Sequence, residues 1–248
     1  MHRFYRPDMG TENHLWLDGD EAHHALRVLR LRVGEDVGVF DGSGTECTGR
    51  VERIERGRVR IDITRREPVN RDPELRVTLG CSLVKAKAMD ELVDRCCELG
   101  LRELVPIETR RSVPKVERKE AAHVARWERI AIEASKQCGR TTVTHIAAPR
   151  PLAALVEKAA QWDLRLIFSP DDAAAPLREV LQAHPRPTSV LYLIGPEGGF
   201  ELAELRLAIG AGFLPVRLGR STLRSETAAA AALAAILYHY EQGGDPLA

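Results

Sequence analysis

The chain has 248 residues, of which 44% are hydrophobic and 29% charged, with 36 basic and 36 acidic side chains. This length allows one large domain or two modest ones, and the composition is that of a globular protein able to bury a core. The longest apolar run, Ala228–Leu237, is about half as long as a membrane helix. The N-terminal residues carry charge but no apolar stretch typical of a secretory signal. We therefore expect a cytoplasmic protein.

The cysteines are odd in number, and none of them follows a C-x-x-C spacing. Cys96 and Cys97 are adjacent, and neighbouring residues rarely ligate one metal or bridge each other. This pattern predicts free thiols in a reducing compartment and no metal site.

The charges are unevenly distributed along the chain, although they balance overall. Arginines outnumber acidic residues in 50–76, basic residues are in excess in 102–140, and acidic ones are in excess from Thr141 onward. An excess of positive charge in one half favours a polyanionic partner, but solvated charged faces produce the same statistics. Both interpretations remain open from charge alone.

Residues 1–70 are predicted to form a small β-barrel. Strands are expected at 36–41, 46–54 and 59–64, separated by glycine turns, with a helix after Gly19 that carries Ala22, Ala25, Leu26 and Leu29 on one face. The stretch Arg65–Leu75 has two prolines and no apolar periodicity, which is typical of a linker. We assign 1–70 to a first domain, 71–75 to a linker and 76–248 to a second domain.

From Arg76 onward, strands alternate with helices. Strands are expected at 77–84, 103–108, 143–147, 164–169, 189–195 and 213–218, and helices at 87–100, 117–139, 152–161, 176–183, 202–211 and 226–241. Gly100 suits the position just after a helix. This alternation predicts an α/β domain with a mainly parallel sheet.

Ligands of such sheets bind in the loops that follow the carboxyl ends of the strands, and two of these loops have unusual sequences. The first, GPEGG at Gly195–Gly199, has three glycines that allow a backbone to approach a ligand closely. It matches neither a P-loop nor a dinucleotide fingerprint. A tight turn into a helix that begins near Glu201 and Glu204 explains it equally well.

The second loop runs from Gly219 to Ala228. Ser225 is expected to cap the last helix, with Glu226 in its first turn. A capping role does not explain Arg224, because a cation is unfavourable at a helix N-terminus. Arg224 is therefore expected to contact an anion or a polar ligand.

Together, LIGPEGGFE (193–201) and LGRSTLRSETA (218–228) resemble the paired C-terminal motifs of the RsmE family. These SPOUT-class methyltransferases methylate N3 of a uridine in small-subunit ribosomal RNA. The segments HHALRVLR, DGSG, ELGLRELVPIETRRSV and RWERIAIEASKQCGR extend the resemblance, in order, over nearly the whole chain. Ser221 and Thr222 depart from it, since they replace an arginine and an apolar residue.

The resemblance implies a PUA-like barrel followed by a SPOUT domain with a C-terminal trefoil knot. It also implies S-adenosylmethionine as cofactor, bound in the loops Phe168–Pro170, Gly195–Gly199 and Leu218–Leu223. The cofactor-binding residues that we assign are Phe168, Ser169, Leu193, Ile194, Gly195, Pro196, Glu197, Gly198, Gly199, Leu218, Gly219, Leu223, Thr227 and Ala228.

The implied reaction must remove the weakly acidic N3 proton of uracil. Arg224 is expected to stabilise negative charge on a uracil oxygen, and Glu226 or Glu197 to accept or relay the proton. The sequence does not assign this role to one carboxylate. With no metal expected, catalysis then consists of orientation and proton management.

The implied partner is 16S ribosomal RNA within the small ribosomal subunit. The residues that we expect to contact RNA are Arg3, Arg27, Arg30, Arg110, Arg111, Lys136, Gln137 and Arg140. A homodimer with shared active sites is also expected, because the helix at 226–241 is apolar nearly all round. Three alternatives remain open: a ribose 2′-O-methyltransferase of the same class, a non-catalytic RNA-binding assembly factor, and a nucleotide-binding enzyme.

Overall fold

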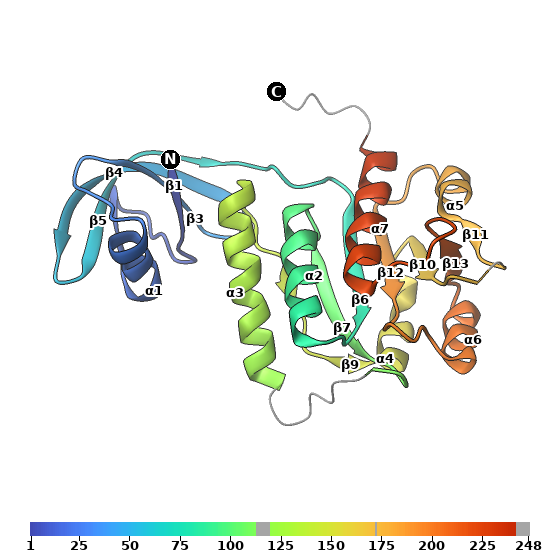
Figure 1. Ribbon diagram of the computed structural model, residues 1–248. Coiled ribbons are helices and arrows are strands. Elements are labelled where there is room, and N and C mark those ends of the chain that lie inside the picture. The colour runs from blue at the N-terminus through green and yellow to red at the C-terminus, as the bar shows by residue number, and fades with distance from the viewer. Residues whose placement is uncertain (113–119, 172, 242–248) are drawn as a thin grey trace. The chain divides into compact units, whose positions relative to one another are not determined.

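The computed structural model describes residues 1–112, 120–171 and 173–241, which form two compact units (Figure 1). The first unit contains Met1–Asp72 and Ile132–Val143, and the second contains Pro73–Ala131 and the residues from Thr144 onward. The sequence predicts a change of domain at 71–75. No pattern in it indicates that the chain returns to the first unit at 132–143.

The first unit is built on a five-stranded sheet in the order β1-β3-β4-β5-β2. Its strands are β1 (His2–Tyr5), β2 (His14–Leu17), β3 (Asp36–Phe40), β4 (Thr45–Glu55) and β5 (Arg58–Pro68). The three expected strands are confirmed, whereas β1 and β2, of four residues each, are missing from the prediction. The prediction of a linker from Arg65 is wrong at its start, because Arg65–Pro68 pair with Thr45–Thr48 in an antiparallel ladder.

The expected helix in this unit is confirmed, and it ends in an unusual turn. Helix α1 (Gly19–His23) continues directly into one wide π-helical turn, η1 (His24–Val28). Ala22 and Ala25 are buried in the core of the unit, together with side chains from the sheet such as Phe4 and Leu17. The face of the helix that carries small side chains therefore packs on the sheet, as the periodicity of the sequence predicts.

The second unit contains an eight-stranded sheet in the order β11-β13-β10-β12-β6-β7-β8, with β9 also paired to β7. All of its pairings are parallel, which confirms the predicted sheet. The two-residue strands β9 and β11 are missing from the prediction. The strands are β6 (Arg76–Ser82), β7 (Glu103–Glu108), β8 (His145–Ile146), β9 (Arg150–Pro151), β10 (Leu164–Phe168), β11 (Ala175–Pro176), β12 (Ser189–Ile194) and β13 (Leu214–Arg217).

The helices agree closely with the expected ones. They are α2 (Ala86–Glu98), α3 (Glu120–Cys138), α4 (Leu152–Val156), the 3-10 helix η2 (Ala159–Gln161), α5 (Leu177–Ala183), α6 (Leu202–Gly210) and α7 (Ser225–Tyr240). The helix expected at 152–161 is divided between α4 and η2, and the expected residues 117–119 lie outside the described residues. Gly100 has a φ of 99°, the left-handed conformation expected just after α2.

Helices cover both faces of the parallel sheet, so its central strand is buried on both sides. In β12, Leu191 and Leu193 pack in a core with α4 and α6, whereas the Tyr192 hydroxyl donates a hydrogen bond to the carbonyl of Ala229 in α7. Helices α2 and α7 lie side by side (Figure 1). Burial on both faces explains why residues 190–194 of this strand are almost entirely apolar. Across the described ranges, no helix combines the length and apolarity needed to span a bilayer.

Candidate functional site

A pocket opens at the carboxyl ends of β10, β12 and β13, next to the N-terminus of α7. Because these strands are neighbours in the order β13-β10-β12, the loops that follow them meet at one edge of the sheet. The pocket encloses an empty volume of about 650 Å³, part of which is open to solvent. The lining residues are Phe168, Ser169, Pro170, Ile194, Gly195, Pro196, Glu197, Gly199, Arg217, Leu218, Gly219, Ser221, Thr222, Leu223, Ser225 and Ala228.

Most of the residues assigned to the cofactor from the sequence line this pocket, but Leu193, Gly198 and Thr227 do not. The Leu193 side chain is fully buried, and its Cδ2 would lie 2.5 Å from a Cβ added at Gly80. The carbonyl of Gly198 accepts a hydrogen bond from Arg111 instead. Leu193 therefore belongs to the core, and Gly198 to the outer side of its loop.

Sequence reasoning missed Ser225 and Arg217 as lining residues. Arg224, rather than Ser225, is the N-cap of α7, so the expected capping role of Ser225 is wrong. The buried Ser225 hydroxyl donates a 2.9 Å hydrogen bond to the carbonyl of Gly195 and thereby joins the two loops. A serine before an apolar helix has the pattern of a cap, and only the tertiary contact distinguishes the two roles.

The three catalytic candidates have no partner among the described residues, because none of them forms an ion pair or side-chain hydrogen bond there. Glu197 is exposed and lines the pocket, while Arg224 is exposed and Glu226 half-buried just beside it at the start of α7. Their charges are therefore available to a bound ligand.

The cysteines are free thiols, and the one beside the site, Cys81, has low reactivity. All five cysteines are free, as predicted, and four of them are buried. Burial raises the pKa of the Cys81 thiol far above its ordinary value, and the charges of Cys96, Glu197 and Glu226 act in the same direction. A thiol with a raised pKa stays protonated at neutral pH, and a protonated thiol is a poor nucleophile.

The residues assigned to RNA fall into two groups. Arg27, Arg30 and Gln137 are exposed, and the side chains of Arg110 and Arg111 are 80% and 51% exposed. Arg30 has a φ of 54°, a left-handed conformation that is uncommon outside glycine. These side chains are accessible to a nucleic acid.

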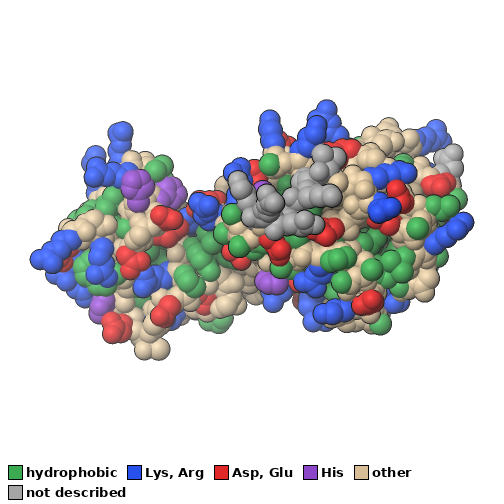
Figure 2. All heavy atoms as spheres, turned by 90° about the horizontal axis from the view of Figure 1, so that it is seen from below, with side chains coloured by type: hydrophobic (Ala, Val, Ile, Leu, Met, Phe, Trp, Pro, Cys, Tyr) green, Lys and Arg blue, Asp and Glu red, His purple; other side chains and the backbone are tan. Residues whose placement is uncertain are grey.

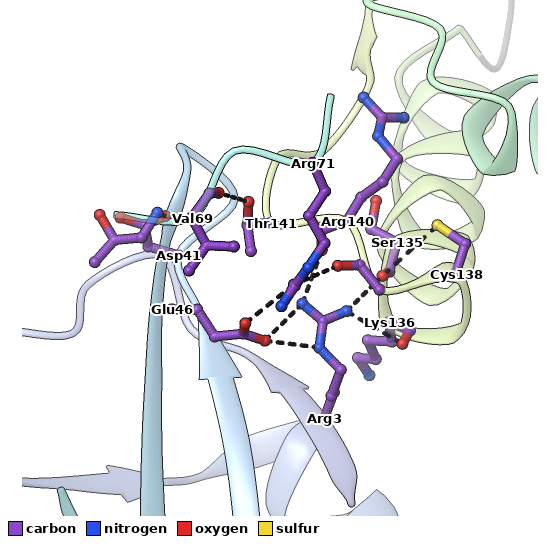
Figure 3. Close-up of polar contacts among 12 residues, drawn as sticks. Arg3, Asp41, Glu46, Val69, Arg71, Ser135, Lys136, Cys138, Arg140 and Thr141 are labelled. Carbon is purple, nitrogen blue, oxygen red and sulfur yellow. Dashed lines mark hydrogen bonds and ion pairs between the residues drawn. The ribbon is translucent and has the colours of Figure 1, made fainter. Parts of the chain in front are cut away.

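Arg3, Lys136 and Arg140 are instead part of a buried polar network, so the expectation that they contact RNA is corrected (Figure 3). The Arg3 guanidinium binds Glu46 at 2.9 Å and donates to the carbonyls of Ser135 and Arg140, at the end of α3. Lys136 forms ion pairs with Glu21 and Glu133, and Arg140 forms one with Asp72 at 2.8 Å. The sequence shows these charges but not their buried partners.

The surface charges give no single basic face in the view of Figure 2, where blue and red side chains are interspersed over both units. On the sheet of the first unit, several basic side chains are paired, as in Arg50 with Asp36 and Arg60 with Glu52.

Two family models match this chain: an RNA methyltransferase domain over residues 71–237 and an RNA methyltransferase PUA domain over residues 17–64. A curated relative from Synechocystis, ribosomal RNA small subunit methyltransferase E, is 32% identical over 93% of this chain and 75% of its own. The fold, the pocket and these matches define the class, an RNA methyltransferase with an N-terminal PUA domain. The chain belongs to the ribosomal RNA small subunit methyltransferase E family, RsmE.

Solved structures agree with this assignment. The enzyme of the same name from Neisseria gonorrhoeae, bound to S-adenosyl methionine, has a TM-score of 0.88 and 31% identity, over 96% of this chain and 97% of that one. A Legionella pneumophila protein in complex with the cofactor SAM has a TM-score of 0.89 and 33% identity, with the same coverage. The predicted fold class, a PUA-like domain followed by a SPOUT-type α/β domain, is confirmed.

Proposed function

We propose that this protein transfers the methyl group of S-adenosylmethionine to N3 of a uridine in 16S ribosomal RNA. The observation that carries the proposal is the pocket at the ends of β10, β12 and β13, which is lined largely by the two loops that resemble the RsmE motifs. The relative from Neisseria gonorrhoeae, which matches over nearly the whole chain, is described as bound to S-adenosyl methionine.

The lining of the pocket suits this cofactor. Phe168, Leu218 and Leu223 offer apolar surface to the adenine, and backbone groups of Gly195–Gly199 offer hydrogen bonds to its edge. When bound, the cofactor supplies an electrophilic methyl group on a sulfonium. The protein residues then have to orient the uracil and manage its N3 proton.

Arg224, Glu197 and Glu226 are the residues that we assign to this task. The Arg224 guanidinium stabilises negative charge on a uracil carbonyl oxygen, and Glu197 or Glu226 accepts the N3 proton. The support for these roles is their place at or beside the pocket and their lack of partners among the described residues.

The RNA surface of the first unit is, in this proposal, the α1–η1 segment with the loop that follows it. Arg27, Arg30 and Arg32 are exposed and make no ion pair with any described residue, and no acidic residue occurs between Ala22 and Gly34. Unpaired arginines are suited to phosphate, since guanidinium groups bind it in a bidentate manner. Arg110, Arg111 and Gln137 are further proposed contacts. The substrate is 16S RNA within the small subunit, which implies a cytoplasmic enzyme.

Salt dependence tests the α1–η1 surface. Replacing Arg27 or Arg30 with glutamine is expected to weaken RNA binding and to lower the slope of log affinity against log salt by about 1 per lost phosphate contact. Arg50→Gln is the control, because Arg50 is already paired with Asp36 on the same unit. If the slopes for Arg27→Gln, Arg30→Gln and Arg50→Gln are equal, Arg27 and Arg30 are solvated surface residues that do not contact RNA.

The proposal includes the trefoil knot of the SPOUT class and a homodimer. In α7, one face is buried and the opposite face keeps Ala230, Ala231, Ala234 and Ala235 half-buried, with Tyr238 76% exposed. Small side chains allow close approach of a second helix, so this face suits a second copy of the chain.

Mapping the modified nucleotide tests the reaction itself. Small ribosomal subunits from a strain lacking this protein are incubated with the purified protein and S-adenosylmethionine, and the digested nucleosides are analysed by mass spectrometry. We expect 3-methyluridine at one position. A 2′-O-methylated nucleoside would favour the ribose-modifying alternative, and no methylation together with no cofactor binding would favour an assembly factor.

A further inference from the structure

The turn after β7, Thr109–Ser112, reaches a loop that does not belong to a neighbouring strand. Strand β6 lies between β7 and β12 in the sheet. The Thr109 hydroxyl donates to the Ser82 hydroxyl at the end of β6, at 3.2 Å, and lies 2.8 Å from the Ser112 hydroxyl. Ser82 is fully buried, so it anchors the turn where it passes over the end of β6.

Two side chains then connect this turn to the GPEGG loop and to Glu201, which follows the loop. Arg111 Nη1 donates a 2.6 Å hydrogen bond to the carbonyl of Gly198. The Glu204 carboxylate accepts hydrogen bonds from two backbone N–H groups: that of Arg110, at 2.9 Å, and that of Glu201, at 2.7 Å. One carboxylate thus joins the turn to the N-terminus of α6.

The loop held in this way contains three glycines and little hydrogen bonding of its own. Gly199 has a φ of 70°, and the loop has one internal hydrogen bond, from Gly199 N–H to the Pro196 carbonyl, at 2.8 Å. Glycine loses more conformational entropy on ordering than any other residue, and ordering a loop on binding reduces affinity. A loop that is already ordered avoids this loss.

We propose that Arg111 and Glu204 are positioning residues that hold Gly195–Gly199 in its cofactor-binding shape. The inference rests on the proposed function, because it gives these residues a role in the same pocket. Neither lines the pocket: Pro196, Glu197 and Gly199 do, and Gly198 directs its carbonyl to Arg111. Their effect on the cofactor therefore passes through the loop.

Calorimetry with S-adenosylhomocysteine, in the absence of RNA, tests this. We expect Arg111→Ala and Glu204→Gln each to weaken binding by about five- to tenfold, the range for loss of a charged hydrogen bond at a partly exposed position. Because both act on one loop, the double variant is expected to lose much less than the product of the two effects. Arg111→Lys keeps a donor and is expected to recover part of the affinity.

Arg126→Ala is the matched control. Arg126 is 59% exposed and donates two hydrogen bonds to Asp90, yet it belongs to α3 and does not reach the loop. It is expected to leave cofactor affinity unchanged. Thermal unfolding of every variant separates a change of affinity from a loss of fold, and steady-state kinetics is expected to show a raised KM for S-adenosylmethionine with Glu204→Gln.

The possible failures are distinct. A wild-type protein that binds no S-adenosylhomocysteine contradicts the proposed function, and the inference with it. Wild-type binding with unchanged affinity in Arg111→Ala and Glu204→Gln overturns the inference alone. Fully additive losses would mean that the two residues do not act through one shared loop. If Arg111→Ala does not fold, Arg111→Lys and Glu204→Gln carry the same comparison.

Discussion

Gly199 is the glycine of the pocket whose backbone conformation disfavours a side chain. Its φ is 70°, and an added Cβ would meet no atom within 4 Å. Gly199→Ala is therefore expected to cost about 1–2 kcal/mol of left-handed strain, without a steric clash. If the loop relaxes to relieve the strain, its hydrogen-bonding groups move away from the cofactor, and affinity falls.

Gly57→Ala is the control for this prediction. Gly57, in the turn between β4 and β5, has a φ of 77° and the same open space around an added Cβ. Both variants are expected to lower the unfolding midpoint by similar amounts in thermal melts, whereas only Gly199→Ala weakens S-adenosylhomocysteine binding by calorimetry. If the two variants bind S-adenosylhomocysteine with equal affinity, the conformation of Gly199 does not contribute to cofactor binding.

At the scale of elements, the end of α3 is held by charged groups of the first unit. Arg3 donates to the carbonyl of Ser135 in the last turn of α3, Arg71 donates to that of Gly139 just past the helix, and Glu46 binds both guanidinium groups (Figure 3). Cations are favourable at a helix C-terminus. These contacts fix the last turns of α3, from Ile132 onward, in the first unit, whereas the earlier turns of the same helix belong to the second unit.

The ion pair between Arg140 and Asp72 gives a prediction at this scale. Their side chains are only 5% and 13% exposed, so Arg140→Met leaves the Asp72 carboxylate buried without its positively charged partner. Breaking such a pair is expected to cost about 3–5 kcal/mol, measured by urea unfolding. Arg50→Met, which breaks the exposed pair with Asp36, is expected to leave the midpoint unchanged. Equal effects would show that burial does not decide the contribution of the pair.

At the scale of the whole molecule, the proposed homodimer predicts complementation between chains. If the α1–η1 surface of one chain presents RNA to the pocket of the other, a mixture of Arg27→Glu and Gly199→Ala chains regains part of the activity that each lacks. Light scattering gives the mass, and a monomer at working concentration would contradict the dimer. Verified mixed dimers without any rescue would contradict only the sharing of sites.

Much of this architecture is predictable because it depends on local periodicity. The run of residues 190–194 has no charged residue and is almost entirely apolar, as expected of a strand covered on both faces, and α1 with η1 has small residues at helical spacing. The short strands β1 and β2 escape prediction because four residues carry too little periodicity. The extension of β5 to Pro68 depends on pairing with β4 rather than on its own charged sequence.

The sequence by itself determined the order of the elements, the parallel sheet and the two loops that meet at the pocket, since motifs and periodicity are local properties of the chain. Only the tertiary structure decided which charges face solvent. Arg27 and Arg140 look alike in sequence, but one is exposed and the other is buried against Asp72. The same holds for Ser225, which bonds to Gly195 and not to its own helix, and for Arg111, which reaches Gly198 across β6. The physical reason is that a side chain's role depends on partners brought close by folding, and those partners lie 30 to 87 residues away in the chain.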